Sequence, residues 1–305
     1  MSATKESGGG QAVPHDRPTL ESVAALAGVS RATVSRVVNG SASVDPRNRK
    51  AVERAVRTLG YVPNRVARSL VTRRNDSYAL VLTESAGRIF TEDPFFATLV
   101  HGVAQEFDAT GNELVLQMPG SPPSRDRITA YALGGHVDGV MVVSLDGADP
   151  LAQRLADRGV PVVVNGRPMS RSAVPYVDVA NADGARLAVR RLVESGRRRI
   201  ATIAGPQHAP GAVDRLAGYR AQLREAHRRP IVAVGNSTRE SGSSAMRRLL
   251  TEHPGLDAVF VASDLMAHGA VQELRQSGRR VPADVAVIGF DDTEVARYTD
   301  PPLTT

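Results

Sequence analysis

The stretch TLESVAALAGVSRATVSRVVNG, residues 19–40, decides the fold of the N-terminal part of the chain. Thr19 is a favourable N-cap, so a helix is expected to begin at the residue after it. Gly28 can end that helix because glycine adopts a positive φ without steric cost. Ser30 then caps a second helix with an apolar stripe over residues 31–38. Two short helices joined by a tight turn predict a helix-turn-helix.

A third helix follows and completes this N-terminal unit. Asp45 and Pro46 form a cap and a first helical residue, and Gly60 ends the helix. Between them, apolar residues recur at helical spacing, as expected for a face that packs on the first two helices. We therefore predict an all-α helix-turn-helix DNA-binding domain over residues 18–62.

Positive charge is concentrated at the N-terminal end of the chain. Of the 38 basic and 32 acidic residues, 13 and 5 respectively fall within residues 1–75, which leaves 25 basic and 27 acidic residues for the rest. A folded basic unit beside a nearly neutral body indicates a polyanionic partner, and double-stranded DNA is the expected one. The alternative is a three-helix protein-interaction module with solvated arginines, which the charge asymmetry disfavours.

The outward face of the second helix carries the residues expected to contact DNA. A recognition helix touches base edges in the major groove with the residues at its start and one turn later, and arginine is the best donor to guanine. We expect base contacts from Arg31, Ala32 and Arg36. Contacts to the DNA backbone are expected from Thr33, Ser35, Asn39, Arg47, Arg49 and Lys50.

Two motifs give this part of the chain a family resemblance. The run AGVSxxTVSRVVN at residues 27–39 and the run GYxPNxxARSL at residues 60–70 closely resemble those of the LacI/GalR family of bacterial regulators. The motifs are specific in combination, and the resemblance extends over nearly the whole chain. It implies a bacterial, nucleoid-associated homodimer that represses transcription from a palindromic DNA operator. The absence of cysteine and of a secretory signal favours a cytoplasmic location.

Residues 63–76 are expected to form a hinge helix and a linker. Pro63 fixes a bend and Asn64 can cap a helix of about eight residues, which is too short to be stable unless a partner surface orders it. The family resemblance implies that the hinge helix lies in the minor groove with Asn64, Arg68 and Leu70, and that Leu70 wedges open a base step. The alternative is that Leu70 packs on the N-terminal domain as a core residue.

Residues 77–305 alternate short apolar runs with helical stretches. Such alternation is typical of parallel sheets with helices on both faces. The pattern restarts around residues 165–178, so the body is expected to be α/β, with two doubly wound parallel-sheet lobes. Ligands of such folds bind beyond the carboxyl ends of the strands. The family resemblance implies the same architecture, similar to periplasmic sugar-binding proteins, with a small polar effector, a sugar, in the cleft between the lobes.

Polar residues at predicted strand ends are the candidates for effector contacts. Asp291 follows the run VAVIGF, and its carboxylate can accept hydrogen bonds from vicinal hydroxyls. Arg215 can present a forked pair of donors. Both match positions that bind the effector in the family, although Asp291 could instead cap a loop and Arg215 could bridge the lobes by an ion pair. The resemblance adds four weaker candidates: Phe96, Asn165, Asp178 and Ser263.

The sequence carries no recognisable catalytic motif. The dinucleotide pattern GxGxxG, the phosphate loop, the GxSxG elbow and the HExxH zinc motif are all absent. There is no cysteine, which excludes thiolate metal sites and disulfides. We therefore expect no enzymatic activity, no cofactor and no metal. The alternative function is a solute-sensing binding protein whose N-terminal domain does not regulate transcription.

The two ends of the chain carry predictions of their own. Residues 1–17 are rich in Gly, Ser and Pro and are expected to be a disordered tail rather than a secretory signal. No run of about eighteen apolar residues exists, so no membrane span is expected. Members of the family usually continue past the PPLTT at residues 301–305, so we expect a truncated C-terminal end, with an open sheet edge and a weaker dimer.

Overall fold

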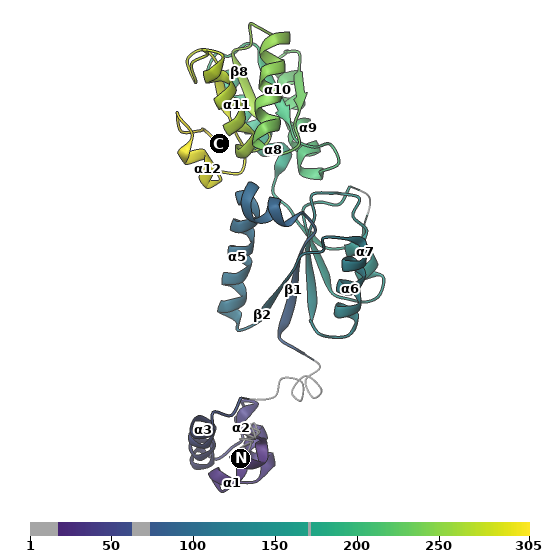
Figure 1. Ribbon diagram of the computed structural model, residues 1–305, viewed down its shortest axis with the longest axis vertical. Coiled ribbons are helices and arrows are strands. Elements are labelled where there is room, and N and C mark those ends of the chain that lie inside the picture. Colours follow the sequence, from purple (N-terminus) through teal and green to yellow (C-terminus); the bar gives the residue numbers. More distant parts are fainter. Residues whose placement is uncertain (1–17, 63–73, 170–171) are drawn as a thin grey trace, which may run out of the picture. The chain divides into compact units, whose positions relative to one another are not determined.

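The chain divides into two compact units, residues 1–73 and 74–305, and each is described by itself. The computed structural model (Figure 1) describes residues 18–62, 74–169 and 172–305. The predicted tail and the predicted hinge residues lie outside this part of the chain: residues 1–17, Asn64, Arg68 and Leu70. Among the described residues, no helix has the length and apolar character needed to cross a membrane.

The helices of the first unit begin at the predicted caps. The Thr19 side chain accepts a hydrogen bond from the Ser22 backbone N–H, and the side chains of Ser30 and Asp45 cap the next two helices in the same way. Gly28 ends the first helix in the left-handed region at φ 67, which costs a residue without Cβ little. The three helices are α1 (Leu20–Ala27), α2 (Arg31–Val38) and α3 (Pro46–Leu59).

These three helices share one small apolar core. Its buried members are Val23, Ala24, Val34, Val37, Val52, Ala55 and Tyr61. The helical spacing that turns Val34 and Val37 inward turns the residues between them outward. Helix α2 therefore presents a face that the core does not use.

The first lobe of the second unit is a parallel sheet with strand order β2-β1-β3-β4-β5. Its strands alternate between two cores, because side chains of successive strand residues point to opposite faces. Ala79 and Val81 pack with α6 and α7, whereas Leu80 and Leu82 pack with α5. The elements are β1 (Ser77–Leu82), the π-helical turn η1 (Arg88–Glu92), α5 (Pro94–Thr110), β2 (Glu113–Gln117), α6 (Pro122–Leu133), β3 (Gly139–Val143), α7 (Leu151–Ala156), β4 (Val162–Asn165) and β5 (Tyr176–Val177).

The second lobe is a parallel sheet with strand order β7-β6-β8-β9. Thr304 adds a short parallel bridge to Ile288 in the last strand. The elements are α8 (Asn181–Glu194), β6 (Ile200–Ala204), α9 (Pro210–Glu225), β7 (Ile231–Val234), α10 (Arg239–Glu252), β8 (Ala258–Val261), α11 (Asp264–Gln276), β9 (Ala286–Ile288) and α12 (Glu294–Tyr298).

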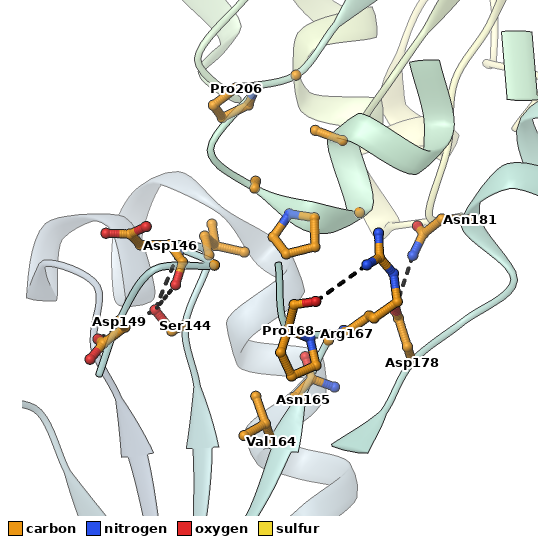
Figure 2. Close-up of a pocket in the computed structure, with 18 of the residues that line it drawn as sticks. Ser144, Asp146, Asp149, Val164, Asn165, Arg167, Pro168, Asp178, Asn181 and Pro206 are labelled. Carbon is orange, nitrogen blue, oxygen red and sulfur yellow. Dashed lines mark hydrogen bonds between the residues drawn. The ribbon is translucent and has the colours of Figure 1, made fainter. Parts of the chain in front are cut away.

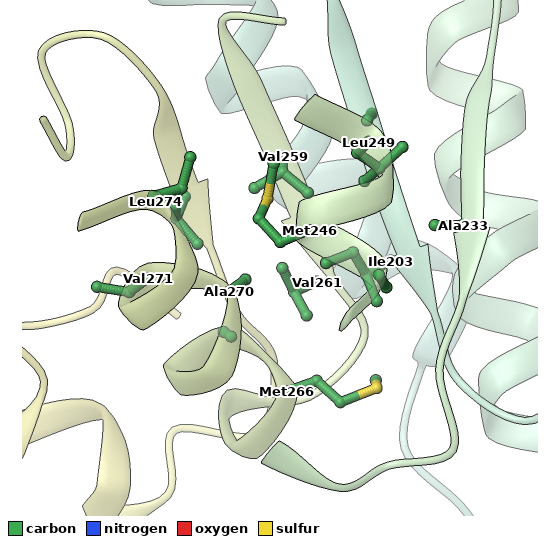
Figure 3. Packing of buried hydrophobic residues seen from close by; sticks show 14 of the residues in the cluster. Ile203, Ala233, Met246, Leu249, Val259, Val261, Met266, Ala270, Val271 and Leu274 are labelled. Atoms are coloured by element: carbon green, nitrogen blue, oxygen red, sulfur yellow. The ribbon is translucent and has the colours of Figure 1, made fainter. Parts of the chain in front are cut away.

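Helices cover both faces of the second sheet. On one face, α10 and α11 bury Met246 and Leu274 against Val259 and Val261 (Figure 3). On the other face, α8 and α9 pack against the alternate residues of the same strands, including Phe260. A parallel sheet that is buried on both faces explains why its strands read as continuous apolar runs. The predicted α/β body with two doubly wound lobes is confirmed, and η1 and α12 are additional elements that the sequence pattern did not predict.

Candidate functional site

A pocket of about 500 Å³ is lined by the loops at the carboxyl ends of the strands of both lobes. Figure 2 shows the first lobe's contribution after β3, with Ser144, Asp146 and Asp149, and after β4, with Asn165 and its neighbours. The second lobe contributes the loops after β6, β8 and β9. This edge of a doubly wound sheet is where small ligands bind, and the volume suits a small organic molecule.

Arg215 and Asp291 form an ion pair in the wall of this pocket. Arg215 comes from α9 and Asp291 from the loop after β9, and Nη2 of the arginine lies 2.8 Å from Oδ1 of the carboxylate. The guanidinium also donates to Asn181 Oδ1 at 2.8 Å and to the Ala262 carbonyl at 2.6 Å. It stacks over the Phe290 ring at 3.7 Å from the centroid. Since every one of these partners belongs to the second lobe, this arginine does not bridge the lobes.

The geometry of this pair is fixed before any ligand arrives. Asp291 has a φ of 102°, a backbone conformation that residues with a Cβ rarely adopt and that surrounding contacts must hold in place. The Asp291 carboxylate keeps further lone pairs for hydroxyl donors, and the Arg215 guanidinium orients it. The pair therefore forms a preorganised polar site for a hydroxylated ligand.

Three further predicted effector residues also line the pocket: Asn165, Asp178 and Ser263. The Asp178 carboxylate is already used, because it accepts from the Arg167 backbone N–H at 3.1 Å and from Asn181 Nδ2 at 3.0 Å (Figure 2). Ser263 caps α11 by accepting from the Met266 backbone N–H. Asp178 and Ser263 therefore shape the pocket, while Asn165 stands at the end of β4 with its side chain half-buried.

The structure corrects one predicted contact. Phe96 is fully buried in the core of the first lobe, packed with Leu80 and Leu82, and does not line the pocket. Its neighbour Phe95 lines the pocket instead. The run Asp-Pro-Phe-Phe places two aromatic residues side by side, and consecutive helix residues point in directions about 100° apart. The sequence motif alone could not decide which ring faces the cleft.

An ion pair that the sequence reading missed connects the two lobes. Arg167 follows β4 in the first lobe, and its guanidinium donates to both carboxylate oxygens of Asp214 in α9, at 2.8 and 3.1 Å from Nη2. The hydrogen bond and charge of Asp214 raise the pKa of Arg167 above its usual value. The sequence feature that could have identified Arg167 as a pocket residue is its position, because it directly follows Asn165-Gly166 at the end of a strand.

The first-lobe wall carries further polar residues that the sequence reading missed. Asp149 pairs with Arg125 at 3.2 Å and is almost fully buried, whereas Asp146 lies at the pocket surface (Figure 2). Arg88, the first residue of η1, and Asp93, which directly follows η1, also line the pocket. Burial raises the pKa of Asp93, while the Phe95 backbone N–H and the Arg88 charge act in the opposite direction.

The outward face of α2 carries the predicted base-contact residues. Arg31, Ala32 and Arg36 are all exposed. The Arg31 side chain is 70% exposed and its Nε lies 3.0 Å from a Glu21 carboxylate oxygen in α1. An exposed pair of this kind is weak, so the Arg31 guanidinium can readily exchange Glu21 for another partner.

The predicted DNA-backbone residues differ in their surroundings. Arg47 and Lys50 are exposed at the start of α3. Arg49 is half-buried and donates to the Ser41 carbonyl, so it braces the turn between α2 and α3. The remaining three lie in or just after α2: Thr33, which bonds to the Ser30 side chain, and Ser35 and Asn39, which bond to each other.

Among the described residues, no group of acidic or histidine side chains is arranged to hold a metal ion.

Known protein families match both parts of the chain. Residues 19–64 match the family described as "Bacterial regulatory proteins, lacI family". Residues 189–305 match the family described as "Periplasmic binding protein-like domain". The first match covers the helix-turn-helix unit, and the second covers most of the second lobe.

Individual relatives match nearly the whole chain. The HTH-type transcriptional regulator CelR of Thermobifida fusca is 52% identical over 293 residues, which are 94% of this chain and 86% of the relative. The ribose operon repressor of Haemophilus influenzae is 34% identical over 291 residues, with 94% and 86% covered.

Solved structures match the fold over the same length. A structure described as the transcriptional regulator CelR–cellobiose complex has a TM-score of 0.70 at 49% identity, covering 94% of this chain and 86% of the other. The lac repressor dimer bound to operator and the anti-inducer ONPF has a TM-score of 0.80 at 32% identity, with 94% and 86% covered.

Proposed function

The chain belongs to the LacI family of bacterial regulatory proteins, and from this membership we propose that it represses transcription until a sugar in its two-lobed body changes its affinity for an operator. It is a DNA-binding transcription regulator and not an enzyme. We propose that it acts as a homodimer on a palindromic operator, in the cytoplasm and associated with the nucleoid. The observation that supports a sugar as the effector is the preorganised Arg215–Asp291 pair in a pocket at the strand ends.

We propose that α2 reads the operator with Arg31, Ala32 and Arg36. Thr33, Ser35, Asn39, Arg47, Arg49 and Lys50 are proposed to contact the DNA backbone. Asn64, Arg68 and Leu70 are proposed to enter the minor groove. The exposure of the α2 face supports the first set, because its arginine side chains have no role in the core. Arg49 is proposed to act chiefly through its carbonyl contact, which orients the start of α3.

We propose a neutral sugar as the effector, with cellobiose as the first candidate. The relative that is 49% identical was solved in complex with cellobiose. Proposed contacts are Asp291 and Arg215, with Asn165, Asp178 and Ser263 shaping the pocket and Phe95 in the role first expected of Phe96. Coupling to DNA follows if cellobiose binds one arrangement of the lobes better than another.

The DNA-binding part of this proposal is tested by selecting an operator from a randomised duplex pool and then measuring variants on it. Arg36→Ala should weaken operator binding by about 1–3 kcal/mol and relax preference at one base position. Lys50→Ala is the matched control, which should weaken binding evenly across sequences and lower the salt dependence. Equal operator affinity of Arg36→Ala and the parent would remove Arg36 from the recognition surface.

The effector part is tested by adding cellobiose to the operator complex. Asp291→Ala should abolish the effect of cellobiose and leave operator affinity in the absence of sugar unchanged. The physical reason is that the carboxylate that accepts sugar hydroxyls is lost, while the first unit is untouched. A variant whose operator affinity still responds to cellobiose would show that Asp291 is not part of the effector site.

A further inference from the structure

Arg88 stands in the pocket wall with unmet hydrogen-bonding capacity. Its side chain is only 18% exposed, and its Nε and Nη2 are buried without an acceptor among the described residues. The nearest carboxylate oxygens lie 3.7 Å from Nη1, on Glu84, and 4.0 Å from Nη2, on Asp93. These distances are beyond a hydrogen bond. Buried donors without acceptors are costly, and because Arg88 also lines the pocket, a small rotation of its guanidinium would present one of these nitrogens to an acceptor on a ligand.

Asp93 stands beside Arg88 with one oxygen uncommitted. Its Oδ1 accepts from the Phe95 backbone N–H at 3.1 Å and so caps α5. Its Oδ2 faces Arg88 without a hydrogen bond. The negative charge of Asp291 contributes to the raised pKa of Asp93, so the two carboxylates, one from each lobe, lie within electrostatic reach of each other.

The pocket therefore holds two Arg–Asp pairs on its two lobes, Arg215–Asp291 and Arg88–Asp93. Each pair offers a carboxylate to hydroxyl donors and a guanidinium to hydroxyl oxygens. Phe95 lies next to the first-lobe pair and adds an apolar surface to the same wall. Two such pairs in one cavity of about 500 Å³ fit a ligand that carries hydroxyl groups at both of its ends.

The charges of the residues that line the pocket disfavour an anionic ligand. Five carboxylates line the pocket, those of Asp93, Asp146, Asp149, Asp178 and Asp291. Among the described lining residues, three guanidinium groups face them, those of Arg88, Arg167 and Arg215. An anionic sugar would meet a net negative wall at short range, where repulsion is weakly screened. A neutral sugar meets no such penalty.

We infer that Arg88 and Asp93 form a second subsite, which binds the second ring of a neutral disaccharide while Arg215 and Asp291 bind the first. This inference rests on the proposed function, because it takes the same pocket as the effector site. The second-lobe pair binds a single ring on its own, since its geometry is already fixed by its neighbours. The first-lobe pair completes its hydrogen bonds only when a second ring reaches it. Its contribution therefore appears as preference for a disaccharide over a monosaccharide.

The experiment measures the affinities of the full chain for cellobiose and for glucose by ligand-induced thermal shift, and takes their ratio. Asp93→Asn keeps the N-cap of α5, because an asparagine side chain also accepts from the backbone N–H. We expect this variant to lose about tenfold or more in cellobiose affinity, the usual effect of removing a hydrogen bond to a charged group. Its glucose affinity should stay within about twofold of the parent value on the same scale.

Further variants make the result decisive. Arg88→Gln should lower the cellobiose-to-glucose ratio in the same way, which keeps the test valid if Asp93→Asn folds poorly. Asp126→Asn is the control, since Asp126 is an exposed carboxylate of the same lobe that pairs with Arg154 and does not line the pocket. An unchanged ratio in both subsite variants, or equal losses for the two sugars, overturns the second subsite alone. A parent that binds neither sugar overturns the subsite together with the proposed sugar effector.

Discussion

The two lobes line one pocket, but Arg215 in the wall of the second lobe and Arg88 in the wall of the first are held differently. Arg215 in the second lobe has hydrogen-bond acceptors on Asn181, Ala262 and Asp291. Arg88 in the first lobe has buried nitrogens without an acceptor among the described residues. The second lobe is thus a preformed binding surface, whereas the wall of the first lobe is completed by what enters the pocket.

The same contrast extends to the packing of the sheets. All residues of β6 and β8 are buried, because helices cover both faces of the second sheet. The central strands β1 and β3 of the first lobe are almost as buried, and the outer strand β7 of the second lobe is partly exposed. In the first lobe, however, the β4 residues are half-buried, the β5 residues are exposed, and α5 buries only Phe96. Because helices cover the first sheet less completely, less apolar area is removed from water, and burial stabilises the first lobe less. The first lobe, whose pocket wall holds the unpaired nitrogens of Arg88, is also the lobe with the looser core.

The largest expected effect comes from truncating one leucine in each lobe. Leu249 of α10 is 1% exposed in the second core, whereas Leu99 of α5 is only partly buried. Leu249→Ala should destabilise the second lobe by about 2–5 kcal/mol, the usual cost of a buried cavity. Leu99→Ala should cost less, because water can already reach its site. Hydrogen exchange followed by peptide mass spectrometry assigns each loss of protection to its lobe.

This comparison would fail if the two leucine variants lost equal protection, each in its own lobe. The two cores would then be equally tight, and the contrast between the lobes would be confined to the polar groups of the pocket wall. Loss of protection in both lobes from Leu249→Ala alone would instead show that the lobes unfold as one cooperative unit.

A smaller effect is expected from the ion pair that joins the lobes. Asp214→Asn removes the charge that holds Arg167, and this pair forms only while the two lobes lie as they do here. Both side chains are partly exposed, so the pair contributes about 1 kcal/mol or less, and cellobiose affinity should fall about fivefold at most. Titration calorimetry with cellobiose measures this loss.

Glu225→Gln is the matched control for that variant. Glu225 of α9 also binds an arginine through two hydrogen bonds, but its partner Arg186 is in α8 of the same lobe. Cellobiose affinity of this control should equal that of the parent. If both variants lost affinity equally, the effect would reflect the stability of α9 and not the link between the lobes.

The elements of the fold were predictable where local chemistry sets them. The three predicted N-caps are observed at Thr19, Ser30 and Asp45, because capping depends only on a side chain and the backbone next to it. The parallel strands were predictable because burial on both faces produces continuous apolar runs. Helix α12 was not predictable in the same way: it is five residues long and buries only Ala296, too little to make a periodic pattern.

The site was predictable only where a residue's place on its element determines its direction. Asp291 lies three residues after the end of β9, so its position at the pocket edge was expected. The pairing of Arg215 with Asp291 was not, because it depends on how α9 crosses the sheet. Arg88 lies on a π-helical turn, and Phe96 differs from Phe95 by one step of rotation about α5. The direction in which the Arg88 side chain points, and which of the two phenylalanines faces the pocket, cannot be predicted without the three-dimensional packing of the first lobe.

The smallest effect concerns pH and acts through Asp93. Burial raises the pKa of Asp93 above its ordinary value of 3.8, with the charges of Asp291 and Glu84 adding to the rise and that of Arg88 opposing it. The folded chain therefore binds this proton more tightly than the unfolded chain does. The resulting stability is fully present below pH 3.8 and is lost as the pH rises through the folded-state pKa.

Asp93→Asn removes this titration while keeping the cap on α5, so it isolates the contribution of one carboxyl group. Relative to the parent, the variant should gain stability as the pH rises from 3.8 toward neutrality, because only the parent must then bury a charge. Melting temperatures of both proteins, followed by circular dichroism across that range, measure the difference. A difference that stays constant with pH would mean that the first-lobe wall already solvates the Asp93 carboxylate fully.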